Sequence, residues 1–72
     1  MVSTDINRLK VILAEEKVTN KWLAEQLGVA PNTVSSWVRN AKQPSIQTFV
    51  QISHILKVDI REFFTPTYPT KK

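Results

Sequence analysis

The chain contains no cysteine and a single glycine among its 72 residues. Without cysteine it has no disulfide, no thiolate metal ligand and no thiol nucleophile, which fits a reducing compartment. One glycine is too few for the many tight turns of an all-β protein. No apolar run is long enough to span a membrane, and no hydrophobic signal segment opens the chain. These absences predict a helical protein of the cytoplasm.

Positive charge exceeds negative charge: ten lysines and arginines stand against six aspartates and glutamates, for a net charge of +4. A small basic domain suits a polyanionic partner, although a merely soluble basic protein has the same balance. Catalysis has little support, because His54 is the only histidine and the adjacent Glu15 and Glu16 diverge on a helix. No glycine-rich phosphate loop or metal-ligand motif appears. We therefore expect no catalytic residue, metal or cofactor.

Apolar residues recur at helical spacing in five short bursts, which predict five helices joined by turns. The expected helices are 5–16, 20–27, 32–39, 46–57 and a short one that starts after Asp59. Thr19 and Ser45 are good N-caps for the second and fourth helices. Gly28 is placed to end the second helix, and Pro31 suits the first position of the third. The sequence thus predicts a compact all-α domain.

The first expected helix has a clear apolar side. Its core-facing residues are Ile6, Leu9, Ile12 and Leu13. At 100° per residue, Asn7 and Arg8 point away from that side, and Val11 falls off it. Thr4 or Asp5 can cap this helix.

The stripes of the other helices predict one small core. It is expected to contain Leu23, Ala24, Leu27, Val34, Trp37, Phe49, Ile52 and Leu56. The apolar face of the fourth helix is wide and takes in Ile46 and Val50, while Ile55 points to the opposite side.

The end of the chain closes this core and then changes character. Glu62 follows Asp59 by three residues, an acidic version of the capping box. The apolar residues placed to close the bottom of the core are Ile60, Phe63 and Phe64. Pro66, Pro69 and two terminal lysines follow. We expect one domain over 1–64 and a flexible Pro/Lys tail over 65–72.

The second and third helices form a helix-turn-helix candidate. Their connection, Gly28–Val29–Ala30–Pro31, is about four residues long and begins with glycine. Tight packing needs a small residue on the second helix, and Ala24 supplies it. Val29 is expected to fill the angle between the two helices.

The outward face of the third helix carries amides and hydroxyls but no acid, a combination that suits base edges in a major groove. Candidates for base reading are Pro31, Asn32, Thr33, Ser35 and Ser36. Candidates for phosphate contact are Thr19, Asn20, Lys21, Arg39, Lys42, Gln43 and Ser45. A solvated polar face is the alternative, but serine and threonine are mediocre helix formers, so stability does not explain them.

At this point the chain resembles the Cro/C1-type (XRE-type) helix-turn-helix family of regulators over residues 19–64. The matching positions are Leu23–Ala24, Leu27–Gly28–Val29, Val34, Trp37, Pro44–Ser45, Leu56, Val58 and Phe63. The first helix fits as well, so the resemblance covers about 5–64. It implies a five-helix, lambda-repressor-like domain that binds double-stranded DNA sequence-specifically, its third helix in the major groove, acting as a small transcriptional repressor in the cytoplasm at the nucleoid.

This sequence departs from the family pattern at three positions. Many members have serine or threonine in place of Ala30, glutamate in place of Val38 and glycine in place of Asn40. In some members that glutamate forms an ion pair with an arginine of the first helix, where this chain has Leu13. An apolar contact between Leu13 and Val38 can replace that ion pair without loss of stability. These departures leave the DNA-facing groups in place.

Two kinds of protein contact are also expected. The resemblance implies a dimer, and we expect a weak one through the fourth and fifth helices, using Ile55, Ile60, Phe64 and the tail. The alternative function is an antitoxin-like interaction module that binds a protein partner as well as its own promoter. In that case exposed Ile55, Phe64 and Tyr68 would form the contact.

Overall fold

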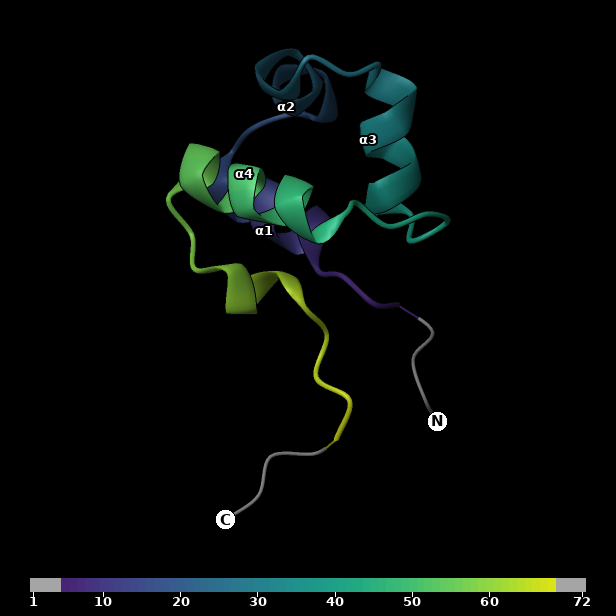
Figure 1. Cartoon of the computed structure of the whole chain (residues 1–72), viewed down its shortest axis with the longest axis vertical. Coiled ribbons are helices and arrows are strands. Elements are labelled where there is room, and N and C mark those ends of the chain that lie inside the picture. The colour runs from purple at the N-terminus through teal and green to yellow at the C-terminus, as the bar shows by residue number, and fades with distance from the viewer. Residues whose placement is uncertain (1–4, 69–72) are drawn as a thin grey trace.

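The structure is a computed structural model and describes residues 5–68. Its elements are α1 (Leu9–Glu16), α2 (Asn20–Leu27), α3 (Pro31–Val38), α4 (Ile46–Leu56) and the 3₁₀ helix η1 (Ile60–Phe63). The predicted all-α fold is confirmed, except that the short fifth helix is a 3₁₀ turn (Figure 1). The cap predicted at Thr4 and the tail residues 69–72 lie outside the described residues.

The ends of α2 and the start of α4 follow their local sequence signals. The Thr19 hydroxyl accepts a hydrogen bond from the backbone N–H of Trp22 at 3.0 Å, as an N-cap does. The Ser45 hydroxyl likewise accepts from the N–H of Thr48 at 3.1 Å. Gly28 ends α2 with φ +73°, a left-handed conformation that glycine adopts without steric cost. These caps are confirmed.

The start of α1 differs from the prediction. The helix begins at Leu9 rather than at Asp5, and the Asn7 side chain is 3% exposed instead of pointing to solvent. Asn7 is held by its own hydrogen bonds: its Oδ1 accepts from the Leu9 N–H at 2.9 Å, and its Nδ2 donates to the Trp37 carbonyl at 3.0 Å. Because residue 6 precedes the helix, Ile6 is not on the core stripe and is 54% exposed.

One apolar core lies between the helices. Its buried members are Leu9, Ile12, Leu13, Leu23, Ala24, Val34, Trp37, Phe49, Ile52, Leu56 and Phe63. The predicted core is confirmed except for Leu27, which is half-buried. Leu27 is the last residue of α2 and lines an open hollow of about 300 Å³ beside Gln51 and Ile55 of α4. Its position at the mouth of this hollow leaves it partly in solvent.

The buried face of α4 is narrower than the sequence predicted. Only the stripe Phe49, Ile52 and Leu56 is buried, whereas Ile46 (63%) and Val50 (40%) are exposed. Ile55, predicted to point away from the core, is half-buried and packs against it.

The aromatic residues after α4 close the core, as predicted. Phe63 of η1 is fully buried, and its ring centroid lies 6.2 Å from that of Phe49. The Phe64 ring lies closer, at 4.8 Å from Phe49. Phe64 is therefore half-buried against the core, as expected of a residue that closes it, and it is not the exposed side chain that the antitoxin-like alternative requires.

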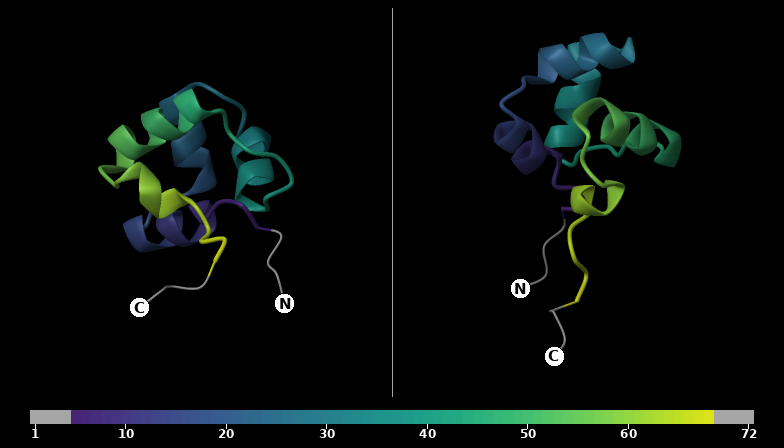
Figure 2. Two further views of the ribbon diagram at one scale, coloured as in Figure 1. Left: turned by 60° about the horizontal axis from the view of Figure 1, so that its bottom comes forward. Right: turned by 90° about the vertical axis from the view of Figure 1, so that its left-hand side faces the viewer.

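The segment before α1 pairs with the last residue of η1 and with the segment that follows η1. The Arg8 N–H donates to the Phe63 carbonyl at 2.7 Å, and the Thr65 N–H donates to the Ile6 carbonyl at 2.8 Å. Both described ends consequently leave the body on the same side (Figure 2). Thr65, where the tail is predicted to begin, is held against the N-terminal segment.

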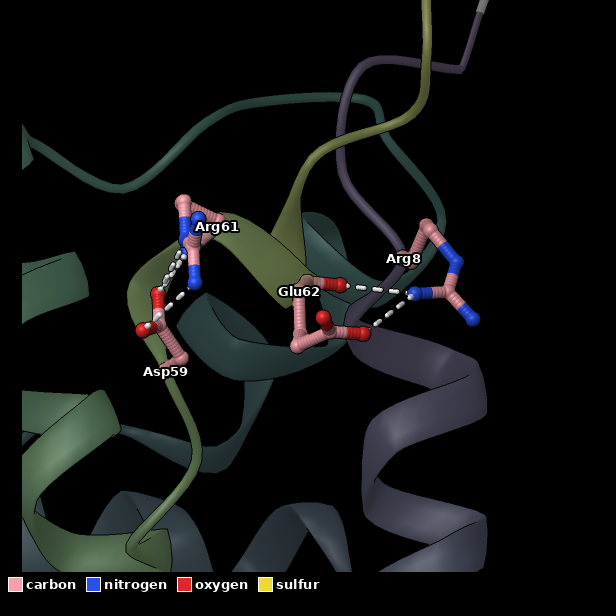
Figure 3. Close-up of polar contacts among 4 residues, drawn as sticks. All are labelled: Arg8, Asp59, Arg61 and Glu62. Atoms are coloured by element: carbon pink, nitrogen blue, oxygen red, sulfur yellow. Dashed lines mark hydrogen bonds and ion pairs between the residues drawn. The ribbon is translucent and has the colours of Figure 1, made fainter. Parts of the chain in front are cut away.

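Two arginines fix η1 (Figure 3). The Arg8 guanidinium donates to the Glu62 carbonyl oxygen at 2.8 Å and lies 3.7 Å from its carboxylate. The predicted capping box is thus only half formed: Asp59 accepts from the Arg61 N–H at 2.9 Å, but Glu62 turns to Arg8. The N–H and guanidinium of Arg61 lower the pKa of the Asp59 carboxyl.

Candidate nucleic-acid interface

The turn between α2 and α3 is built by backbone hydrogen bonds. The Val29 N–H donates to the Ala24 carbonyl at 3.0 Å, and the Gly28 N–H donates to the Glu25 carbonyl at 3.3 Å. Ala24 is buried, as tight helix packing requires. The prediction that Val29 fills the angle between the helices is wrong, because its side chain is exposed and the buried side chains here include Ala24 and Val34.

Helix α3 lies at one edge of the molecule, with α2 against one end and the loop to α4 at the other (Figure 1). Val34 and Trp37 face the core. The opposite side contains the predicted base-reading residues. Pro31 and Asn32 are exposed, and the three hydroxyl-bearing candidates Thr33, Ser35 and Ser36 are half-buried.

The outer side of α3 and the loop after it enclose an open hollow of about 460 Å³. Its lining residues are Asn32, Thr33, Ser36, Trp37, Arg39, Ala41 and Lys42. The hollow therefore brings together three predicted base readers and two predicted phosphate contacts. None of its lining residues is acidic, so no carboxylate repels an anion there.

The two serines of α3 are partly used within the fold. The Ser36 hydroxyl donates to the Thr33 carbonyl at 2.7 Å, which leaves the hydroxyl oxygen as an acceptor. The Ser35 hydroxyl accepts from the Asn20 amide of α2 at 3.3 Å, so this pair links the two helices. Asn20 and Ser35 thus have a structural partner in addition to their predicted roles.

The remaining phosphate candidates fall into two groups. Lys21, Arg39 and Lys42 are exposed cations, and Arg39 also donates to the Ser35 carbonyl at 3.4 Å. Thr19 and Ser45 are exposed caps at the N-termini of α2 and α4, where backbone N–H groups favour anions.

Gln43 is placed differently from the other phosphate candidates. It is half-buried, its Nε2 donates to Asn40 Oδ1 at 3.1 Å, and its Oε1 accepts from Asn7 Nδ2 at 2.7 Å. Sequence reasoning missed Asn7 as a member of this region. The sequence placed Asn7 on the outward side of the expected first helix, and nothing near it indicates partners 30 or more positions away.

Within residues 5–68, the structure gathers no group of three or more histidine, aspartate or glutamate side chains that could hold a metal ion. None of the helices in the same part of the chain has the length and apolarity to cross a membrane.

Comparison with known proteins agrees with this geometry. The helix-turn-helix family model matches residues 9–63, most of the chain. The structure is also similar to the crystal structure of a "putative DNA-binding protein" from Bacteroides fragilis, with a TM-score of 0.82 and 47% sequence identity. That similarity covers 83% of this chain and 97% of the other. No curated protein sequence gives a significant match.

A helical domain with this turn and this edge helix defines the class of helix-turn-helix DNA-binding regulators. The chain belongs to the helix-turn-helix family of the Cro/C1 (XRE) type, as its sequence pattern predicted.

Proposed function

We propose that the chain binds double-stranded DNA sequence-specifically, with α3 in the major groove, and represses transcription. The observation that carries this proposal is the open hollow on α3, where Asn32 and Ser36 lie beside Arg39 and Lys42 without a carboxylate. Amides and hydroxyls read base edges, and cations neutralise phosphates. One surface thus presents both the base-reading groups and the phosphate-neutralising cations that a sequence-specific DNA-binding protein needs.

Asn32 is the best candidate for direct base reading. It lies in the first turn of α3, the part of a recognition helix that contacts base edges. Its amide has no hydrogen-bond partner within residues 5–68, so both of its polar ends are available to a ligand. An asparagine amide can make two hydrogen bonds to adenine. Ser36 lies one turn further along the same hollow and offers its oxygen as an acceptor.

Arg39 and Lys42 are best placed to anchor the phosphates. They line the hollow at the end of α3 that is distant from Asn32. Lys21 lies in the first turn of α2, beside the N-terminus that Thr19 caps. Contacts from both helices would fix the orientation of α3 on the duplex without selecting its sequence.

We also propose a weak dimer through α4 and η1, formed on DNA. Ile46 and Val50 are one turn apart and expose apolar surface on α4, whereas Ile55, Ile60 and Phe64 are half-buried. A two-fold dimer of such domains contacts half-sites about 10 base pairs apart. The antitoxin-like alternative has less support, because Tyr68 alone of its three proposed contact residues is exposed.

Selection of bound duplexes from a random pool tests the proposed function. We expect enrichment of one sequence motif with two-fold symmetry. A duplex that contains this motif should then give a gel shift at a protein concentration at which a duplex of unrelated sequence gives none. Equal retention of all sequences would contradict sequence-specific binding. Retention only in the presence of a copurified protein would favour the interaction-module alternative.

A further inference from the structure

Three amide side chains meet behind the end of α3, and we call Asn7, Asn40 and Gln43 the amide cluster. Asn7 is the buried member and donates from Nδ2 to the Trp37 carbonyl at 3.0 Å and to Gln43 Oε1 at 2.7 Å. Its Oδ1 accepts from the Leu9 N–H at 2.9 Å. One side chain thus connects the start of α1, the last turn of α3 and the loop that follows α3.

Asn40 makes the return connection from the loop. Its Oδ1 accepts from the N–H groups of Ile6 and Asn7 at 2.8 and 2.9 Å and from Gln43 Nε2 at 3.1 Å. Its Nδ2 donates to the Asn7 carbonyl at 3.1 Å. Its backbone is left-handed, with φ +60°, a conformation that asparagine adopts more readily than most residues other than glycine. A glycine at this turn would have none of these bonds.

The loop that the amide cluster holds is part of the candidate DNA surface. Asn40 directly follows Arg39, and Ala41 and Lys42 come next; these three neighbours line the hollow on α3. On the other side, the segment that Asn40 holds is itself bonded to the end of η1 through the Arg8 N–H and to the segment after η1 through the Thr65 N–H. The loop is therefore bonded to the segment before α1, and that segment is bonded in turn to Phe63 and Thr65 at the other end of the fold.

We propose that Asn7 and Asn40 are positioning residues for DNA binding. They contact no DNA themselves; they hold α3 and the Arg39–Lys42 loop in the one relative orientation in which base readers and phosphate anchors meet a duplex together. This inference rests on the proposed function. If the loop were released, only a fraction of molecules would have the binding orientation, and the apparent affinity would fall in proportion to that fraction.

Asn40→Gly is the direct test. Glycine keeps the left-handed backbone but removes the four side-chain hydrogen bonds of Asn40. We call the duplex selected from the random pool the operator, and we expect the affinity of this variant for it to be about tenfold weaker, corresponding to one competent molecule in about ten. The slope of log affinity against log salt should stay unchanged, because the final complex makes the same phosphate contacts. The Ile6 and Asn7 amide protons should exchange faster in the free variant.

Two further variants make this result interpretable. Lys57→Gly is the matched control for removing a side chain at a left-handed position, because Lys57 has φ +57° and lies outside the amide cluster; its Ile6 and Asn7 amide protons should exchange as they do in the wild type. Asn7→Ser keeps a hydroxyl that can accept from Leu9 and is too short to reach Trp37 and Gln43. It should weaken binding in the same way as Asn40→Gly. Circular dichroism at the assay temperature ensures that only folded protein is compared.

The outcomes separate this inference from the proposed function. If the wild-type chain binds the operator and both Asn7→Ser and Asn40→Gly bind it with the same affinity, the amide cluster only stabilises the fold. A flatter salt plot for Asn40→Gly would also contradict positioning, since a phosphate contact would then have been lost. A wild-type chain that binds no duplex would contradict the proposed function and this inference with it, whatever the amide exchange shows.

Discussion

Replacement of Leu23 by alanine tests the packing on which α2 depends. Leu23 is fully buried among the core residues, so Leu23→Ala removes apolar contact and leaves a cavity. Such changes destabilise a protein by about 2–5 kcal/mol. A chain of this length has a free energy of unfolding of about 4–11 kcal/mol at typical values per residue. The substitution should therefore remove a large part of the stability.

Leu27→Ala is the matched control, since it makes the same chemical change on the same helix. Leu27 is half-buried at an open hollow, so its loss should cost only about 1 kcal/mol. Urea unfolding followed by circular dichroism measures both variants. At a slope of about 1 kcal/mol per M, a loss of about 3 kcal/mol lowers the midpoint by about 3 M. A Leu23→Ala curve that overlays the wild type, or a larger loss for Leu27→Ala, would refute the assigned face of α2.

Two further predictions concern local structure. Gly28→Ala should destabilise the chain by about 1–2 kcal/mol in thermal unfolding through the left-handed backbone alone, because a Cβ at Gly28 meets no atom within 4 Å; a neutral result would contradict this. Asp59 has a lowered pKa beside Arg61, so its small contribution to stability is present above the ordinary aspartate pKa of 3.8 and is lost as the pH falls through the folded-state value. Melting temperatures on acidification should consequently fall slightly more for the wild type than for Asp59→Asn, and equal slopes would contradict this.

The helix-turn-helix could be predicted from the sequence because its signals are local. Thr19 caps α2, Gly28 ends it, and Pro31 starts α3, each within a few residues of the feature it determines. The exposed candidates Asn32 and Arg39 followed from the helical period alone. Such features depend little on distant parts of the chain.

The start of α1 could not be predicted in the same way. Asn7 is polar and falls on the outward side of the helical period, which predicts an exposed residue. Its burial depends on Trp37, Asn40 and Gln43, all at least 30 positions away. The same applies to Ile46, whose exposure depends on how other elements pack around α4. Periodicity specifies which residues share a face but not how much of that face a neighbour covers.

Asn32→Ala tests whether the outward side of α3 reads bases. Operator and random duplexes should be compared over a salt series, with Arg39→Ala as the contrasting variant. Asn32→Ala should cost about 1–3 kcal/mol on the operator and little on random DNA. Arg39→Ala should weaken binding to both duplexes and flatten the salt plot by about one unit. If Asn32→Ala leaves the affinity for both duplexes unchanged, α3 does not lie in the groove.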